Sequence, residues 1–219
     1  MNIRVLDKND KAALEQLIFT IENALPVPEW WIPIDDIERS HFFDADWTCF
    51  LGAFNDDNEL VAASALFFNE HEFAEEAEKL GLDIHSTNVA EVGRCMVHPD
   101  FRGHNLMCEL NKRLCSIARN RGIDTILAVA HPDNVASNSS FRRLGAELKA
   151  TATVFGSYQR NMYISGLQFF LKAFKQAFAT CQNIPVSCLK ISRIPRVCHI
   201  KSASCKSKQL IYLLIRIST

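Results

Sequence analysis

The sequence has no Asp or Glu after Glu147, although its 219 residues include 25 acidic ones. Residues 166–219 nevertheless hold 9 of the 24 Lys and Arg residues, so this segment is basic and the rest of the chain is acidic. The overall formal charge of -1 hides that division. We therefore predict one domain at residues 1–165, followed by a basic, acid-free C-terminal extension of unknown role at 166–219.

Several other features are missing. No apolar run approaches the roughly 18 residues that a membrane-spanning helix needs, and the amino terminus lacks the pattern of a signal peptide. The eight cysteines include no CxxC pair, so zinc-site spacing is absent and we predict no metal site. Cysteines that pack as small buried hydrophobes are typical of a reducing compartment, and we expect a cytoplasmic protein.

Strand-like and helix-like patterns follow one another along residues 1–165 in an α/β order. The expected strands lie at 3–6, 48–56, 59–68, 90–97, 126–130, 147–155 and 158–164, and the expected helices at 12–24, 71–81, 106–122 and between Asn134 and Gly145. Asn9 or Asp10 is a candidate cap for the first helix. A hairpin followed by strand, helix, strand units predicts a mixed twisted β-sheet with helices on both faces.

The most informative segment is EVGRCMVHPDFRG at residues 91–103, which predicts a strand that ends in a turn and opens a helix. The first N–H groups of a helix have no internal partner, and the helix dipole makes that end partly positive. The loop is therefore suited to bind a phosphate. A second marker, N-x-x-S-x-x-x-F-x-x-x-G, runs from Asn134 to Gly145.

Together these motifs resemble the acetyl-CoA-binding core of the GNAT superfamily of N-acetyltransferases, most strongly between Glu91 and Gly145. The family's pyrophosphate loop reads R/Q-x-x-G-x-G/A, and those positions hold Arg102, Gly103, His104, Asn105, Leu106 and Met107. Asn105 replaces the middle glycine, and asparagine enters left-handed conformations more readily than most residues. The resemblance implies a GNAT-like fold over residues 1–165 and acetyl-CoA as the acyl donor.

The resemblance also assigns roles to single residues. The main chain of Cys95, Met96 and Val97 is expected to pair with the pantetheine arm and to stabilise the oxyanion. Asn134 and Phe141 are expected beside the cofactor. Phe141 stands where the family usually has a tyrosine acid, and a phenyl ring cannot protonate the departing thiolate. Water or another hydroxyl is the expected proton source.

An amine acceptor must lose a proton before it attacks a thioester, because an alkylammonium with a pKa near ~10.4 is almost wholly charged at pH 7. Glu91 is the first candidate base, and strand alternation predicts that it shares one face with Gly93, Cys95 and Val97. His131 is the second, at the end of the strand 126–130. The ordinary alternatives are a charged residue near a strand's start for Glu91 and a surface turn residue for His131.

Recognition of the acceptor, a small-molecule or protein amine, is weakly encoded. The segment 22–46 combines Trp30 and Trp31 with five acidic residues after position 34, which could line an entrance for an amine. A solvated loop over packed tryptophans, or a homodimer surface, explains it equally well. In the extension, residues 167–180 predict an amphipathic helix that could contact a membrane surface, RNA or the acidic domain. No DNA binding is expected.

The sequence thus predicts an acetyl-CoA-dependent N-acetyltransferase that acts on a primary amine by direct attack in a ternary complex. The alternative is a GNAT-fold protein that binds acyl-CoA with little turnover and works as a sensor or a partner-binding module. The missing tyrosine at position 141 and the replaced glycines of the phosphate loop favour that alternative.

Overall fold

The computed structural model describes residues 1–85, 87–166, 190–194 and 197–201. It contains two units, Met1–Phe170 and Leu171–Thr219, which are described separately. In the second unit, β8 (Lys190–Ile194) and β9 (Val197–Lys201) form an antiparallel pair. The amphipathic helix predicted at 167–180 lies outside the described residues, and the predicted boundary after residue 165 stays a prediction.

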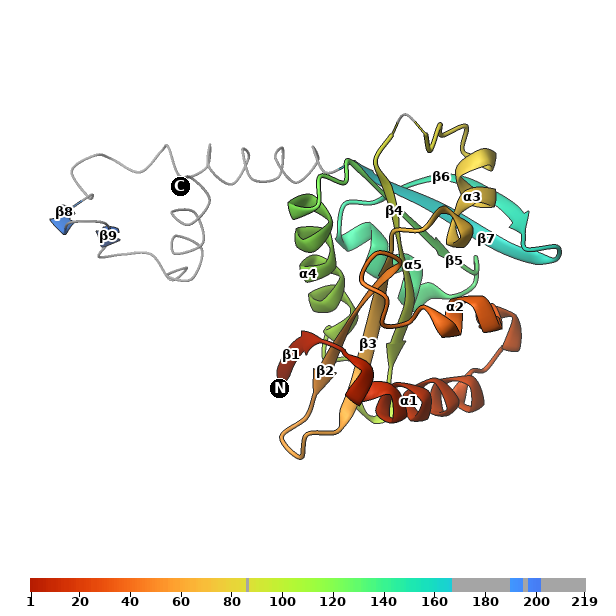
Figure 1. Ribbon diagram of the computed structural model, residues 1–219, viewed down its shortest axis with the longest axis horizontal. Helices are drawn as coiled ribbons and strands as arrows, with labels where there is room; N and C mark the ends of the chain where they lie inside the picture. The colour runs from red at the N-terminus through yellow and green to blue at the C-terminus, as the bar shows by residue number, and fades with distance from the viewer. Residues whose placement is uncertain (86, 167–189, 195–196, 202–219) are drawn as a thin grey trace. The chain divides into compact units, whose positions relative to one another are not determined.

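The first unit is built on a seven-stranded sheet with the strand order β1-β2-β3-β4-β5-β7-β6 (Figure 1). Its strands are β1 (Asn2–Val5), β2 (Thr48–Phe54), β3 (Leu60–Phe67), β4 (Val89–Val97), β5 (Thr125–Ala130), β6 (Glu147–Val154) and β7 (Tyr158–Gly166). β4 and β5 are parallel, whereas the other neighbouring pairs are antiparallel. The predicted mixed sheet is confirmed.

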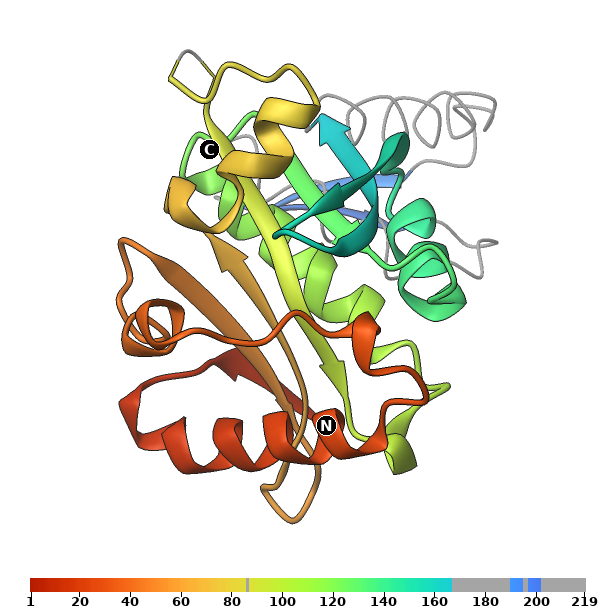
Figure 2. The same ribbon diagram turned by 90° about the vertical axis from the view of Figure 1, so that its right-hand side faces the viewer.

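Helices cover both faces of this sheet. They are α1 (Lys11–Ala24), α2 (Asp36–Ser40), α3 (Ala74–Lys79), α4 (Leu106–Asn120) and α5 (Val135–Arg143), with 3-10 turns at η1 (Lys8–Asp10), η2 (Pro28–Trp30), η3 (Glu70–Glu72) and η4 (Pro99–Phe101). α1 and α4 lie on opposite sides of the central strands (Figure 2). None of the helices in the described part of the chain is long and apolar enough to cross a membrane.

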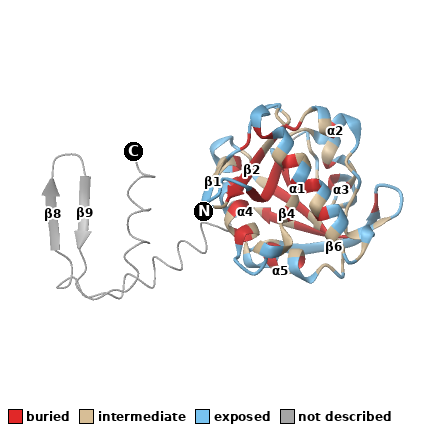
Figure 3. Cartoon of the chain, turned by 90° about the horizontal axis from the view of Figure 1, so that it is seen from below, coloured by how far each residue is buried: buried red, intermediate tan, exposed pale blue. Residues whose placement is uncertain are grey.

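Two apolar layers hold these helices in place. α1 buries Leu14, Leu17, Ile18 and Ile21, the stripe predicted from their spacing, against Phe50, Phe67 and Met96 on one face of the sheet. α4 buries Leu106, Leu110, Leu114 and Cys115 against Leu51, Val61 and Val92 on the other face. Figure 3 shows buried residues gathered along the sheet and on the facing sides of both helices.

The first helix is capped differently from the prediction. The Asp7 side chain accepts a hydrogen bond from the Asn9 backbone N–H at 2.7 Å, and Asp10 accepts one from the Asp7 N–H at 2.9 Å. This reciprocal capping box opens η1, which leads directly into α1. Asp10 holds the N-cap position of α1, as predicted, but its side chain makes no capping hydrogen bond, because the carboxylate is occupied by the Asp7 N–H and by an ion pair with Arg4.

A bulge interrupts β4 in the middle of the sheet. Ala63 pairs with Met96 and Ala65 pairs with Gly93, so Ser64 alone stands opposite Arg94 and Cys95. Arg94 has a φ of 47°, in the left-handed region. The extra residue reverses the alternation of the strand: Gly93 approaches Glu91 and Phe67, whereas Cys95 and Val97 pack with the α4 layer. The prediction that all four residues share one face was therefore wrong for Cys95 and Val97.

β4 also separates from β5. The parallel pairing covers only Val89–Glu91 with Thr125–Leu127, although both strands continue beyond it. In the described residues, the edge of β4 after Glu91 that faces β5 has no strand partner. This edge supplies unpaired main-chain groups between the two strands.

Packing of α4 should dominate the stability of the first unit. Leu114→Ala removes a fully buried side chain (0% exposed), and we expect the free energy of unfolding to fall by about 2–5 kcal/mol. Leu148→Ala is the matched control, because Leu148 is 44% exposed, and it should cost less than about 1 kcal/mol. Urea denaturation of both variants measures the difference, and equal losses would contradict the assigned core.

Candidate active site

Two adjoining cavities occupy the region where β4 and β5 separate. The first has a volume of about 330 Å³ and the second about 660 Å³. Six residues line both cavities: Ile21, Leu25, Trp30, Cys95, Asn134 and Ser137. The two spaces therefore meet beside the bulge of β4 and the beginning of α5. An arrangement of this kind can bring two ligands into contact.

The second cavity is formed largely by the predicted phosphate loop. Nine of the eleven residues predicted to bind a cofactor line it: Cys95, Met96, Val97, Arg102, Gly103, Asn105, Leu106, Met107 and Asn134. Gly103 has a φ of 83° and Asn105 a φ of 60°, which agrees with the left-handed conformation predicted for Asn105. His104, also predicted, is exposed and does not belong to this lining. The loop leads into the N-terminus of α4, whose N–H groups favour an anion.

The turn between β5 and α5 is held by two asparagines. Asn134 caps α5, because its side chain accepts a hydrogen bond from the Ser137 N–H at 3.1 Å. Asn138 donates to the carbonyls of His131 (2.8 Å) and Asn134 (2.7 Å) and accepts from the Tyr163 hydroxyl at 2.6 Å. This buried network fixes the wall that both cavities share. Sequence reasoning missed Asn138.

Phe141 lines the first cavity, not the second. Its ring is 3% exposed and packs against Tyr163 with the centroids 5.6 Å apart. Tyr163 is fully buried and its hydroxyl is engaged by Asn138, so it is no free proton donor. Neither ring replaces the family's missing tyrosine acid.

Cys95 contacts polar groups behind the sheet. Its Sγ lies 3.2 Å from Ser64 Oγ, which itself donates to Asn111 Oδ1 at 2.7 Å. Burial raises the pKa of the Cys95 thiol, so the thiol stays protonated. The side chain of this residue packs against the α4 layer, and the ligand role of its main chain stays a prediction.

Glu91 lies in the first cavity and is only 6% exposed. Burial raises its pKa well above the usual range for a glutamate, and the charge of Glu76 raises it further. Arg94 acts in the opposite direction. A carboxyl group in this environment is a stronger base than an exposed one once it is ionised.

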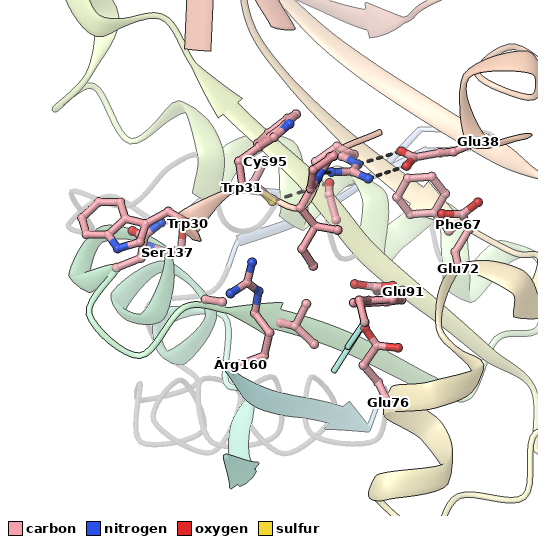
Figure 4. Close-up of a pocket in the computed structure, with 18 of the residues that line it drawn as sticks. Trp30, Trp31, Glu38, Phe67, Glu72, Glu76, Glu91, Cys95, Ser137 and Arg160 are labelled. Carbon is pink, nitrogen blue, oxygen red and sulfur yellow. Dashed lines mark hydrogen bonds and ion pairs between the residues drawn. The ribbon is translucent and has the colours of Figure 1, made fainter. Parts of the chain in front are cut away.

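Glu76, on α3, is a second buried carboxyl group in the same cavity (Figure 4). Its side chain is 1% exposed, and neither oxygen has a hydrogen-bond partner in the described residues. Burial raises the pKa of Glu76 to about 7, and the charge of Glu75 adds to the effect. The backbone N–H of Glu76 itself lowers this pKa in part, although it forms no hydrogen bond with the carboxyl oxygens.

Two arginines face these carboxyl groups. Arg94 is paired: its Nε donates to Glu38 Oε1 at 2.7 Å, its Nη2 also contacts Glu38, and its Nη1 donates to the Ile32 carbonyl at 2.5 Å. Arg160, from β7, is 2% exposed and donates only to main-chain carbonyls, those of Gln159 at 2.7 Å and Glu29 at 2.9 Å. Burial lowers the pKa of Arg160.

The second predicted base lies beside the cavities without lining them. His131 Nδ1 accepts a hydrogen bond from the Asp133 N–H at 3.2 Å, and its ring centroid is 6.5 Å from that of Trp30. Trp30 lines both cavities, whereas His131 lines neither. Of the two candidate bases, only Glu91 is in the cavity wall.

The residues missed by sequence reasoning left weak signals. Glu76 falls three residues after Phe73 and four before Leu80, on the apolar stripe of α3. Arg160 shares strand parity with Met162, which is fully buried. For both Glu76 and Arg160, the signal is a charged side chain at a position that the sequence pattern predicts to be buried. In the described residues, no group of three or more His, Cys, Asp or Glu is placed to hold a metal ion.

The sequence matches a known protein family. Residues 16–146 match the family model described as Acetyltransferase (GNAT) family. A search of curated protein sequences found no significant match.

Solved structures share the fold. A probable acetyltransferase from Staphylococcus epidermidis is 21% identical, with a TM-score of 0.57 over 75% of this chain and 98% of its own. YncA of Salmonella typhimurium, a putative acetyltransferase solved with its cofactor acetyl-CoA, is 20% identical, with a TM-score of 0.56 over 76% and 94%. A ribosomal-protein-alanine N-acetyltransferase from Brucella melitensis is 22% identical, with a TM-score of 0.56 over 76% and 100%. At these identities the likeness shows the fold alone.

Burial of Glu76 predicts a pH dependence of stability. With a pKa of about 7 in the folded protein and the usual 4.5 in the unfolded chain, the folded state binds more protons between these values. The contribution to stability is therefore complete below pH 4.5 and is lost as the pH rises through 7.

Glu76→Gln should abolish that slope. Relative to wild type, we expect the variant to gain about 2–3 kcal/mol of unfolding free energy between pH 5 and pH 8, measured by urea denaturation. Glu78→Gln, an exposed site on the same helix, is the control and should show no gain. A similar pH response of the two variants would refute the assignment.

Proposed function

Because the chain belongs to the GNAT family of acetyltransferases, we propose that it transfers an acetyl group from acetyl-CoA to a primary amine. Acetyl-CoA is the acyl donor of this family. N-acetylation by direct transfer in a ternary complex is the part that we infer. The observation that carries it is the contact between two cavities, one formed by the phosphate loop and one lined by buried glutamates.

The second cavity has the properties that acetyl-CoA requires. The loop at Arg102–Met107 provides an arginine and the N-terminus of α4 for the pyrophosphate. The space beside Gly103 is open, because a side chain added there would meet no atom within 4 Å. The unpaired edge of β4 at Cys95–Val97 suits the amides of a pantetheine arm. Asn134 stands where the resemblance assigns a further contact. When bound, acetyl-CoA supplies a thioester-activated acetyl group, so that an N–C bond forms as the C–S bond breaks.

Glu91 is the proposed base for the amine. It lines the first cavity, which meets the second one beside Cys95, further along the same strand. Its raised pKa reduces the mismatch with an ammonium group, and the ammonium itself favours the ionised carboxylate. Glu91 therefore takes the proton that the amine must lose. Phe141 has no hydroxyl and that of Tyr163 is engaged by Asn138, so water supplies the proton that the product thiolate takes up.

The acceptor cavity is acidic and aromatic. Asp35, Glu38, Glu72, Glu76 and Glu91 line it together with Trp30 and Trp31. The segment 22–46, predicted as an entrance, supplies both tryptophans and two of these acids. A volume of about 330 Å³ suits a small amine or one terminal residue of a protein. The protein from Brucella melitensis is named for a protein substrate, but its likeness concerns the fold alone. Cytoplasmic location and a homodimer stay predictions.

A charge placed in the phosphate loop tests the donor site. Gly103→Glu should weaken acetyl-CoA binding at least about 10-fold relative to Gly103→Gln, because only the glutamate repels the pyrophosphate. Both substitutions strain the backbone equally at a φ of 83°, so the pair isolates charge. Isothermal titration calorimetry measures the affinities. Equal affinities would exclude this loop as the pyrophosphate site.

Removal of the base tests the proton route. Glu91→Gln should lower turnover by about 10²-fold or more and leave acetyl-CoA affinity near that of wild type. His131→Ala should have a smaller effect, because its ring is outside the cavity wall. Release of the CoA thiol measures turnover across pH, and the acidic limb of the wild-type profile should disappear in Glu91→Gln.

The reverse result, a fully active Glu91→Gln and an inactive His131→Ala, would assign the base to the histidine. Tight acetyl-CoA binding without thiol release for any amine would favour the alternative role as an acyl-CoA sensor or a partner-binding module.

A further inference from the structure

Arg160 is a buried cation without an anionic partner. It is 2% exposed, and both of its hydrogen bonds go to neutral carbonyls. No carboxylate of the described residues forms an ion pair with it. Burial of an unpaired charge is costly, and main-chain carbonyls compensate only part of that cost. A guanidinium group placed in this way in a cavity wall is suited to a ligand anion.

Glu76 is the complementary case. Its two oxygens lack partners at 1% exposure, and it lies in the same cavity near Glu91. Burial favours the protonated, neutral form of Glu76, whereas a ligand cation would stabilise its ionised form. The cavity therefore contains a cation that has no anionic partner, although its Cζ lies 5.2 Å from the centroid of the Tyr158 ring, and a carboxyl group that has no hydrogen-bond partner.

These two groups do not satisfy each other. Arg160 and Glu76 form no ion pair, although each influences the other electrostatically. Three other charged groups in the cavity are engaged: Arg94 pairs with Glu38, and Glu72 accepts a hydrogen bond from Trp47 Nε1 at 3.1 Å. In Figure 4, Arg160 projects into the cavity with Glu76 and Glu91 on one side of it and Trp30 and Ser137 on the other.

The remaining lining is apolar. Trp30, Trp31, Ile21, Leu25 and Phe67 contribute aromatic and aliphatic surface. The indole Nε1 atoms of Trp30 and Trp31 are buried and have no hydrogen-bond partner among the described residues. Arg160 suits a carboxylate, and the apolar surface suits an uncharged side chain.

We propose that the acceptor is an α-amino acid with an apolar side chain, whose carboxylate binds Arg160 and whose ammonium group binds between Glu76 and Glu91. This inference rests on the proposed transfer of an acetyl group to a primary amine. It adds that the amine must carry a carboxylate, and it makes Arg160 the residue that selects for it. The product is an N-acetyl amino acid, since the proton leaves to Glu91 and the carboxylate takes no part in the chemistry.

The test compares acceptors that differ only in the carboxylate. L-Phenylalanine, L-leucine and L-methionine are each paired with the amine that decarboxylation would yield, and release of the CoA thiol gives kcat/KM. We expect each amino acid to exceed its paired amine by about 10²-fold, the scale of a buried charge pair.

Variants then assign the preference to Arg160. Arg160→Gln should lower kcat/KM for the amino acids by about 10²-fold and leave the paired amines within about 3-fold of wild type. Arg160→Lys keeps the charge and should retain part of the preference. Arg113→Gln is the control, because Arg113 is 50% exposed and pairs with Glu109 on α4, and it should change neither class.

Each outcome of these measurements either supports or overturns an amino-acid acceptor and the role of Arg160. Amines used as well as, or better than, their amino acids in the wild type would overturn the inference and leave the proposed acetyl transfer intact. No thiol release with either class would overturn the inference, and the proposed acetyl transfer would fall with it only if no other amine gave thiol release. The wild-type comparison stands even if Arg160→Gln fails to fold, which its melting temperature would reveal. Equal losses for both classes in a folded Arg160→Gln would make Arg160 structural and overturn its assignment.

Discussion

The separation of β4 from β5 is the constraint on which the site depends. Two parallel strands that stay paired leave no room between them, whereas here the pairing stops at Glu91. The bulge at Arg94 turns the strand and moves Cys95 and Val97 to the α4 face. The separation of β4 from β5 leaves unpaired main-chain groups and room for the two adjoining cavities. The sheet gives up ladder hydrogen bonds there, and a bound ligand can replace them.

A second constraint follows from the charges that the bulge helps to bury. Arg94, at the bulge, reaches Glu38 on α2 and the Ile32 carbonyl, so the strained residue fastens the segment after α1 onto the sheet. Arg160 does the same from β7 through the Glu29 carbonyl. Both arginines thus link the wall of the first cavity to the sheet. Of the two arginines, only Arg94 forms an ion pair with a carboxylate, that of Glu38. Arg160 has no anionic partner and Glu76 has no hydrogen-bond partner, so a ligand can stabilise both groups.

Local patterns were sufficient to predict the seven strands of the sheet and the helices α1, α3, α4 and α5, but not the short helix α2. The stripe Leu14, Leu17, Ile18, Ile21 and the left-handed Asn105 need only near neighbours in sequence, and the structure contains both. The bulge was not predictable in this way, because it depends on how β4 registers with β3. Glu76 and Arg160 were missed for the same reason: their meaning arises from the cavity that α3, β4 and β7 build together.

These observations also explain how a chain without the family's tyrosine can retain a defined site. Phe141 fills the core against Tyr163, and the Tyr163 hydroxyl supports Asn138, which in turn fixes the turn that carries Asn134. A tyrosine at position 141 would bring another hydroxyl into this buried layer. Asn138 already accepts the hydrogen bond of the Tyr163 hydroxyl, so burial of the added hydroxyl would be costly. Packing therefore takes the place of proton donation at this position. The titratable groups of the first cavity are instead Glu91 and Glu76, whose burial raises the pKa of both.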